Sequence, residues 1–524
     1  MSSSGERYDR SLKSVGKGTT ALMVSTALLF LFNLIGRVTV AREFTVGAWG
    51  EFNLGVSLSG LLTLVAMLGL ANAIARAISY EKDPAEQWAI IRWGLTISLV
   101  SSVLGTVAMY LLAPDFAIWF HNSGLTIVFQ LFALSVGFTV MANILAAIFQ
   151  GFEDASPNAW FNQVVAPGGF VVALFVALFL HVGFDGVLWA YAIGQGLALV
   201  LISVYTWRRL PKLVPHVGLP KKRPKPGLWT LSFALWGVSS LAVITGYFDT
   251  LVLGVFRPST AVGLYSAATT LARVLLAANL ALTYIYLPVA ARLVRDGDFE
   301  TLRRTYATST RWIILFMVPL LLLFCFDPAL SLTAIFDQSY TGASISLVIL
   351  SIGSFVSVAV GPVNATLAGM AASRILLISM AASAIANIGL SLALIPSTGI
   401  LGASIAWSVA RIIYPGIGTA TLWISHRVTP FQAHFTRPLV WTLILGSPVY
   451  LLASFLHLAT WWVVPLYFFG VALFLAALLA TRSVDRGDMI AAAALEQILR
   501  RKLPRLRAFL ERYIRATPDP PLPH

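Results

Sequence analysis

Long runs of apolar residues alternate with short polar segments along almost the whole chain. Most runs reach about 18 residues, the length at which an apolar stretch can cross a bilayer as a helix. The pattern predicts fourteen membrane-spanning helices, at residues 19–40, 48–71, 89–113, 124–149, 158–181, 184–207, 228–254, 261–290, 312–335, 342–370, 375–396, 400–424, 439–458 and 461–481. The expected fold class is therefore an all-α polytopic membrane protein.

The composition leaves little room for enzyme chemistry. Of the 524 residues, 58% are hydrophobic and 11% are charged, whereas a soluble domain carries about 25% charged residues. The single cysteine, Cys325, lies inside an apolar run, which excludes a disulfide framework. The sequence has no HExxH, P-loop or GxGxxG motif, its seven histidines are scattered, and its predicted outer loops are short. These features predict a protein that is not an enzyme and needs no metal and no cofactor.

The basic residues follow the predicted topology. An even number of spans places both termini on one side, and 31 of the 36 lysines and arginines then lie on that side, counting Arg92 at the inner end of the third span. Because cytoplasmic loops are enriched in lysine and arginine, we expect a multi-pass protein of the cell (cytoplasmic) membrane with both termini in the cytoplasm. The net charge of +14 is then explained by cytoplasmic segments that are attracted to anionic membrane lipids, and no nucleic-acid partner is expected.

The proline- and lysine-rich segment 208–227 divides the first twelve spans into two groups of six. The groups share a weak repeat, in which "GEFNLGVSLSGLL" from Gly50 aligns with "GLYSAATTLARVL" from Gly263, 213 positions later. Because six spans preserve the orientation, the two lobes would be related by a pseudo-two-fold axis along the membrane normal. The predicted parts are a cytoplasmic N-terminal segment (1–18), an N-lobe (19–207), a flexible basic cytoplasmic linker (208–227), a C-lobe (228–424), two further spans (439–481) and a basic cytoplasmic tail (482–524).

The tail has a regular pattern of its own. Leucines and other apolar residues recur at helical spacing between 495 and 513, opposite several arginines. This pattern predicts a basic amphipathic helix on the inner membrane surface. A solvated basic tail is the alternative.

Three arginines remain within the predicted spans, at Arg37, Arg273 and Arg411. Charged groups inside a membrane are costly and usually line a cavity or a pathway. Arginine stays charged when it loses water, and its planar fork matches phosphate or carboxylate. We therefore expect these arginines to bind an anionic substrate. The acids Asp249 and Glu51 are the candidates for coupling transport to H⁺ or Na⁺.

Each of these residues also has a purely structural interpretation. Arg37, and more readily Arg42, could extend to the outer headgroups. Arg273 could form a structural ion pair with Asp249, Arg411 could lie nearer an interface than its position suggests, and Glu51 could be interfacial. The sequence leaves these alternatives open.

Several segments resemble a known family of membrane proteins. They are "GRVTVAREFTVGAWGEFNLGVSLSGLLTLVAMLGLANAIAR" (36–76), "FQGFEDASPNAW" (149–160), "YFDTLVLG" (247–254), "VGLYSAATTLARVL" (262–275), "LPVAARLVRDGDFETLRR" (287–304) and "ANIGLSLALIPSTGILGASIAWS" (386–408). Over roughly 15–425 the chain is similar to the polysaccharide, or lipid-linked oligosaccharide, flippases. These belong to the multidrug/oligosaccharidyl-lipid/polysaccharide exporter superfamily, with the lipid II flippases and the multidrug-and-toxin exporters.

The resemblance implies a function as well as a fold. It implies a flippase that moves a polyprenyl-phosphate or -diphosphate oligosaccharide to the outer leaflet by alternating access between two six-helix lobes. By position, Arg37 and Arg273 match arginines with which the lipid II flippases bind pyrophosphate, whereas Arg411 has no such precedent. Spans 13 and 14 are similar to the pair that forms a lipid-tail groove in those proteins. A glycan polymerase or an oligosaccharyltransferase would then be a partner.

Two other functions stay open at this stage. An organic-cation antiporter of the same superfamily would have an anionic or aromatic pocket, whereas the intramembrane charge here is mainly cationic. An intramembrane glycan polymerase or ligase would have a large outer loop with paired catalytic residues, and the sequence has none. For the flippase, the driving force could be H⁺, Na⁺ or the membrane potential.

Overall fold

A computed structural model gives the fold, and it describes residues 24–214, 227–431, 433–456, 459–481 and 483. These residues are almost entirely helical, and no strand occurs among them. Contacts divide the chain into two compact units, which comprise 1–267 with 384–406 and 268–383 with 407–524. Three helices contribute residues to both units: α9 (Ser259–Arg295), α14 (Ser373–Thr398) and α15 (Ile400–His426).

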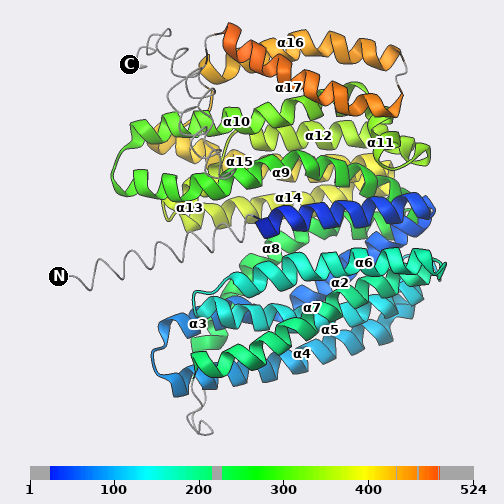
Figure 1. Cartoon of the computed structure of the whole chain (residues 1–524), viewed down its shortest axis with the longest axis vertical. Coiled ribbons are helices and arrows are strands. Elements are labelled where there is room, and N and C mark those ends of the chain that lie inside the picture. Colours follow the sequence, from blue (N-terminus) through cyan, green and yellow to red (C-terminus); the bar gives the residue numbers. More distant parts are fainter. Residues whose placement is uncertain (1–23, 215–226, 432, 457–458, 482, 484–524) are drawn as a thin grey trace. The chain divides into compact units, whose positions relative to one another are not determined.

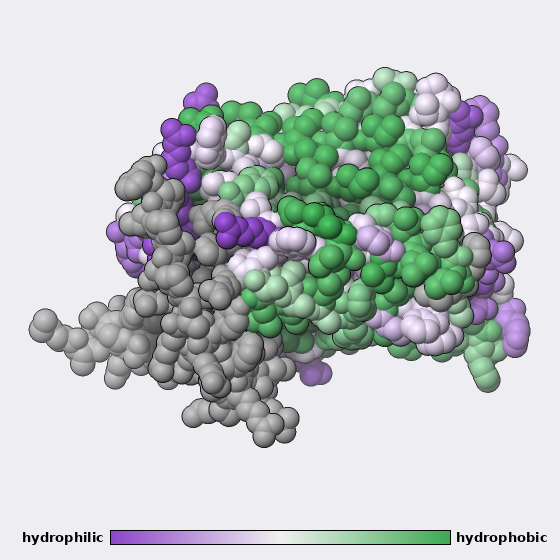
Figure 2. Space-filling view, turned by 90° about the horizontal axis from the view of Figure 1, so that it is seen from above, coloured by the Kyte–Doolittle hydropathy of each residue, from purple (hydrophilic) through white to green (hydrophobic). Residues whose placement is uncertain are grey.

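The fourteen predicted spans are confirmed as helices. Among the described residues, fourteen helical segments are long and apolar enough to cross a membrane, one for each predicted span. Several extend beyond the apolar run, because amphipathic turns continue the helix at its polar end; the third covers Pro84–Trp119. On the face in Figure 2, hydrophobic side chains gather over the middle and hydrophilic ones toward the two ends, as expected for a membrane-spanning bundle.

The first unit is a bundle built around α5. Its α4, α5, α6 and α7 run side by side in Figure 1, and α5 packs against α2, α3, α4 and α7. Its other helices are the first helix (Val24–Glu43), α2 (Val46–Met67), α3 (Leu70–Tyr80), the π-helix η1 (Asn158–Val165) and α8 (Gly227–Phe256); the bundle helices are α4 (Pro84–Trp119), α5 (Leu125–Gly151), α6 (Ala166–Phe179) and α7 (Phe184–Leu213).

The second unit is organised around α10, which packs against α12, α16 and α17. The last two predicted spans therefore belong to this core. The helices α12 and α13 are two parts of one span, separated at Gly361, where the Tyr306 hydroxyl donates to the carbonyl oxygen of Val360. The helices are α10 (Phe299–Phe326), α11 (Pro328–Ile335), η2 (Gln338–Ala343), α12 (Ser344–Ala359), α13 (Val363–Gly369), α16 (Ala433–Phe455), η3 (Thr460–Trp462) and α17 (Val463–Ala480).

Short polar residues set the beginnings of several helices. Thr45 and Asp83 cap α2 and α4 by accepting hydrogen bonds from the backbone N–H groups of Ala48 and Ala85. Asp298 caps α10 through the N–H of Thr301, and its hydrogen bonds to Thr301 lower the pKa of the Asp298 carboxyl. Each cap satisfies a backbone donor that the first turn leaves without a partner.

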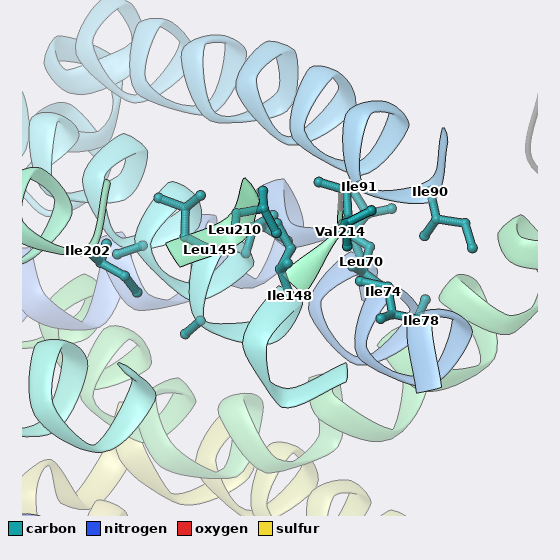
Figure 3. Close-up of a cluster of buried hydrophobic side chains, with 14 residues drawn as sticks. Leu70, Ile74, Ile78, Ile90, Ile91, Leu145, Ile148, Ile202, Leu210 and Val214 are labelled. Carbon is teal, nitrogen blue, oxygen red and sulfur yellow. The ribbon is translucent and has the colours of Figure 1, made fainter. Parts of the chain in front are cut away.

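The predicted cytoplasmic end of the first unit holds a buried apolar cluster (Figure 3). Its side chains come from α3, α4, α5 and α7, so four helices are fixed to one another there. The labelled members are Leu70, Ile74, Ile78, Ile90, Ile91, Leu145, Ile148, Ile202, Leu210 and Val214. Contacts of this kind drive helix association in a membrane through close packing.

The second span is a helix that breaks at Leu68 and Gly69, where φ is 49° and 70°. Two side chains of α8 satisfy the carbonyl groups that the break frees. Ser232 Oγ donates to the Leu68 oxygen at 2.6 Å, and Trp236 Nε1 donates to the Leu64 oxygen at 3.0 Å. Because lipid offers no hydrogen-bond partners, such a break is stable only where protein groups replace the lost helical bonds.

Two glycines allow α2 and α9 to cross closely. A Cβ on Gly50 would lie far inside van der Waals contact with the Ser259 carbonyl oxygen, and a Cβ on Gly263 would do the same with the Val46 carbonyl oxygen. Gly50 and Gly263 stand 213 positions apart, as do Val46 and Ser259. The crossing therefore has the local two-fold arrangement that the repeat requires, while the pseudo-symmetry of complete lobes stays a prediction.

Arg257 lies between α8 and α9 and holds the end of α14. Its Nη2 donates to the carbonyl oxygens of Pro396 at 3.0 Å and Ser397 at 3.2 Å. A cation there compensates the carbonyl groups that a helix end leaves unpaired. We expect Arg257→Ala to lower the free energy of unfolding by about 1 kcal/mol, measured by thermal unfolding in detergent micelles. The exposed Arg42→Ala is the control, and equal melting temperatures for the two variants would contradict this role.

Several predicted parts lie elsewhere or outside the described residues. The helix α7 continues to Leu213, so residues 208–213 of the predicted linker are helical. The N-terminal segment 1–18, the linker from 215 to 226 and the predicted tail helix lie outside the described residues. The helix α8, which begins the predicted C-lobe, packs against α2 and α3 in the first unit, and the lobe bounds stay a prediction.

Candidate functional site

Arg37 lies in the first helix and is half-buried. Its Nη1 donates to Asn53 Oδ1 at 3.4 Å. Asn53 is 5% exposed, and its Nδ2 donates to the Trp49 carbonyl oxygen at 2.7 Å, which turns the amide oxygen toward the guanidinium. The guanidinium also lies 6.0 Å from the centroid of the Trp49 ring, within the range of a cation–π interaction. α2 therefore holds the Arg37 charge in a defined orientation.

Aromatic side chains pack behind Trp49, the ring that faces this arginine. Phe52 stacks on Trp49 and on Phe170, and its ring meets Tyr191 edge-on. Tyr191 of α7 lies within electrostatic range of Arg37 and of Tyr247. Because Arg37 is half-buried, the attraction of its guanidinium for an anion is stronger than it would be for a fully exposed arginine.

Glu51 takes part in a polar group at one end of the first unit. Asn122, just after α4, donates through Nδ2 to Glu51 Oε1 at 2.7 Å and to Ser259 Oγ at 3.0 Å. Its own Oδ1 accepts from the Gly124 N–H at 2.9 Å. Glu51 is thus half-buried and hydrogen-bonded near the crossing of α2 and α9.

Asp249 is the most buried of the predicted site residues, at 1% exposed. Tyr265 of α9 donates its hydroxyl hydrogen to Asp249 Oδ2 in α8. Nothing in the sequence pattern points to this tyrosine as a partner, because the two residues belong to different spans. A carboxylate enclosed in this way fits a coupling role, and the coupling itself stays a prediction.

Arg273 and Arg411 belong to the second unit. Arg273 is half-buried in α9, next to Ala272, whose carbonyl oxygen accepts from Ser354 Oγ of α12 at 3.4 Å. Arg411 is half-buried in α15, and its guanidinium lies 4.9 Å from the centroid of the Trp407 ring. The structure thus places Arg37, Glu51 and Asp249 in the first unit and these two arginines in the second.

The predicted spans leave Arg311 in the loop 291–311 on the cytoplasmic side, whereas the structure places this residue inside a helix. The residue is 3% exposed within α10, and its Nη1 donates to the Ser483 carbonyl oxygen just beyond α17. Its place at the edge of an apolar run gave the wrong indication, because α10 begins twelve residues earlier, at Phe299. Arg311 therefore joins two helices of the second unit. Among the described residues, no group of three or more His, Cys, Asp or Glu side chains could hold a metal ion.

The sequence of the chain matches the model of one protein family. The sequence model described as "Polysaccharide biosynthesis protein" matches residues 15–294, more than half of the chain. The chain belongs to this family. A comparison with curated proteins finds no match.

Solved structures with the same fold are distant in sequence. The lipid II flippase MurJ in an inward closed conformation has 15% identity and a TM-score of 0.67, covering 87% of this chain and 97% of that chain. An inward-facing multidrug resistance MATE family transporter of the MOP superfamily has 16% identity and a TM-score of 0.62, covering 76% and 94%. A MOP superfamily transporter from Pyrococcus furiosus has 17% identity and a TM-score of 0.53, covering 79% and 95%. The chain is thus a multi-pass membrane protein with the MOP superfamily fold.

Proposed function

We propose that the protein is a flippase for a polyprenyl-phosphate- or polyprenyl-diphosphate-linked oligosaccharide. It moves the headgroup from the cytoplasmic to the outer leaflet by alternating access, while the polyprenyl tail stays in lipid. The observation that carries this proposal is Arg37, a half-buried arginine in a membrane-spanning helix, oriented by Asn53 and Trp49, in a polysaccharide biosynthesis protein. A guanidinium placed in this way suits a phosphate group.

The remaining predicted site residues have defined roles in this proposal. Arg273 and Arg411 add positive charge on the path of the headgroup, and Asp249 and Glu51 are the candidates for ion coupling. The protein lies in the cytoplasmic membrane with both termini in the cytoplasm, and acts as a transporter rather than an enzyme. The outer product is consumed by a glycan polymerase or an oligosaccharyltransferase.

The experiment is a flipping assay on the purified protein in proteoliposomes. It follows the protection of a fluorescent polyprenyl-phosphate sugar from an external quencher, with and without an imposed membrane potential. We expect protein-dependent flipping that is faster when the starting side is negative, since the field contributes about 2.3 kcal/mol per charge per 100 mV. Exchange of an organic cation for Na⁺ or H⁺, with no lipid movement, would replace the flippase by an antiporter.

A further inference from the structure

Four amide side chains gather inside the first unit, and none of the residues discussed above belongs to this group. Asn162 of η1 donates through Nδ2 to Asn143 Oδ1 of α5 at 3.2 Å and to Asn158 Oδ1 at 3.0 Å. Gln195 of α7 joins them through Thr139 of α5, whose hydroxyl donates to Gln195 Oε1 at 3.3 Å. We call Asn143, Asn158, Asn162 and Gln195 the amide cluster.

The cluster points toward the interior of the bundle rather than toward lipid. Residues two positions apart lie on opposite faces of a helix. Gln195 is two positions from Ile193 and Leu197, which are 53% and 41% exposed. Asn162 is two positions from Trp160, which is 49% exposed. All four amides are half-buried, so they are partly accessible, and Gln195 and Asn162 lie on faces opposite to the exposed apolar side chains.

The hydrogen bonds leave two of the four amide nitrogens available, because those of Asn143 and Asn162 already donate. The oxygens of Asn143 and Asn158 each accept a bond from Asn162, and that of Gln195 accepts one from Thr139. Among the described residues, Asn158 Nδ2 and Gln195 Nε2 have no protein partner. Unpaired amide groups inside a membrane protein are costly unless water or a ligand satisfies them. The available groups are therefore donors that suit a ligand rich in oxygen.

The chemistry of the cluster favours a sugar over an ion. A metal cation or Na⁺ needs several oxygen ligands, and here three of the four amide oxygens already accept bonds, while no carboxylate belongs to the cluster. A saccharide hydroxyl both donates and accepts, so it complements either end of an amide. The π-helix is a second indication, because single π-turns in helices occur frequently at functional sites.

The cluster also has a defined relation to Arg37. The residue after Asn162, Gln163, accepts through Oε1 from Ser25 Oγ at 2.8 Å and from Thr26 Oγ1 at 3.2 Å in the first helix. Thr26 precedes Arg37 by eleven residues, which is about 17 Å along a helix. We propose that the amide cluster is a binding subsite for the uncharged sugar rings of the lipid-linked headgroup whose phosphate meets Arg37. This inference rests on the proposed flippase function.

The test compares two lipid probes in the proteoliposome assay, a fluorescent polyprenyl phosphate without sugar and the same lipid carrying N-acetylglucosamine. Asn162→Leu and Gln195→Leu are expected to slow the glycosylated probe about tenfold, the effect of losing one or two buried hydrogen bonds, and to leave the bare lipid unchanged. Gln195→Glu removes the Nε2 donor without changing the side-chain volume, and should also slow the glycosylated probe while leaving the bare lipid unchanged. Gln150→Leu changes an exposed amide of the same helix as Asn143 and serves as the matched control.

A second measurement separates this inference from the proposed function. Titration of the purified protein with methyl N-acetylglucosaminide is followed by tryptophan fluorescence, since Trp160 lies in η1. Sugar binding that is lost in Asn162→Leu and kept in Gln150→Leu would support the subsite. If the wild-type protein binds the sugar but moves neither lipid, only the proposed flippase function is refuted. Equal loss of both lipid probes, no effect on either, or a change confined to Na⁺ dependence would overturn the subsite.

Discussion

Replacing Arg37 with alanine is expected to slow the flipping of a polyprenyl-phosphate sugar by about 10- to 100-fold. A hydrogen bond to a charged group contributes about 1.5–3 kcal/mol. Losing one such bond to the phosphate corresponds to a change in rate of this size. Asn53 and Trp49 hold the guanidinium in place, so the substitution removes an oriented charge rather than a mobile one. The measurement is the rate of protection from an external quencher in proteoliposomes.

Two variants make this prediction specific. Arg37→Lys keeps the charge but loses the planar fork, so we expect an intermediate rate. Arg42→Ala removes an exposed arginine from the end of the same helix and should flip at the wild-type rate. If Arg37→Ala were as fast as wild type, Arg37 would be a structural residue. If Arg42→Ala were as slow as Arg37→Ala, the effect would belong to surface charge.

Replacing Gly50 with alanine is expected to destabilise the first unit by about 1–3 kcal/mol, the usual cost of an overpacked contact. The added methyl group would meet the carbonyl oxygen of Ser259. A backbone carbonyl group cannot change its position by rotating about side-chain bonds. The helices α2 and α9 would therefore have to move apart. Thermal unfolding of the purified protein in detergent micelles measures the loss. Gly263→Ala should act alike, since its methyl group would meet the carbonyl oxygen of Val46.

Gly47→Ala is the matched control for this crossing. A Cβ there would lie 3.5 Å from Thr260 Cγ2, an ordinary contact, and Gly47 lies in the first turn of α2, three residues before Gly50. Alanine also favours a helix over glycine, so the melting temperature should stay the same or rise. The double variant Gly50→Ala with Gly263→Ala should cost less than the two single losses together, because both act on one crossing. A Gly50→Ala protein that melts with wild type would disprove the tight crossing.

The sequence allowed the spans to be located because each is a long apolar run, and the structure has a helix for every one. It could not locate the break at Leu68, because the break depends on Ser232 and Trp236, more than 160 positions away in the chain. Apolar periodicity carries no information on which distant polar residue satisfies a carbonyl group. Gly69 was a signal of a break, but a glycine alone does not specify its partners.

The candidate site was only partly accessible to sequence reasoning. Arg37 was conspicuous, because charge within an apolar run is rare. Its orienting residue Asn53 is one of many polar residues near helix ends, and nothing local relates it to an arginine sixteen positions earlier. The amide cluster combines residues of three separate helical elements. Neutral amides do not alter hydropathy enough to be noticed one at a time.

The crossing of α2 and α9 also bears on the ancestry of the chain. If its halves arose by duplication of one gene, the ancestor was a homodimer in which one glycine met its own copy across the two-fold axis. Any larger side chain at that position would have clashed in both subunits at once, so few residues would have been tolerated. After fusion the two positions could mutate separately, yet each glycine still packs directly against the backbone of the other's helix. Homologues should therefore keep positions 50 and 263 small together, and lose that restriction together.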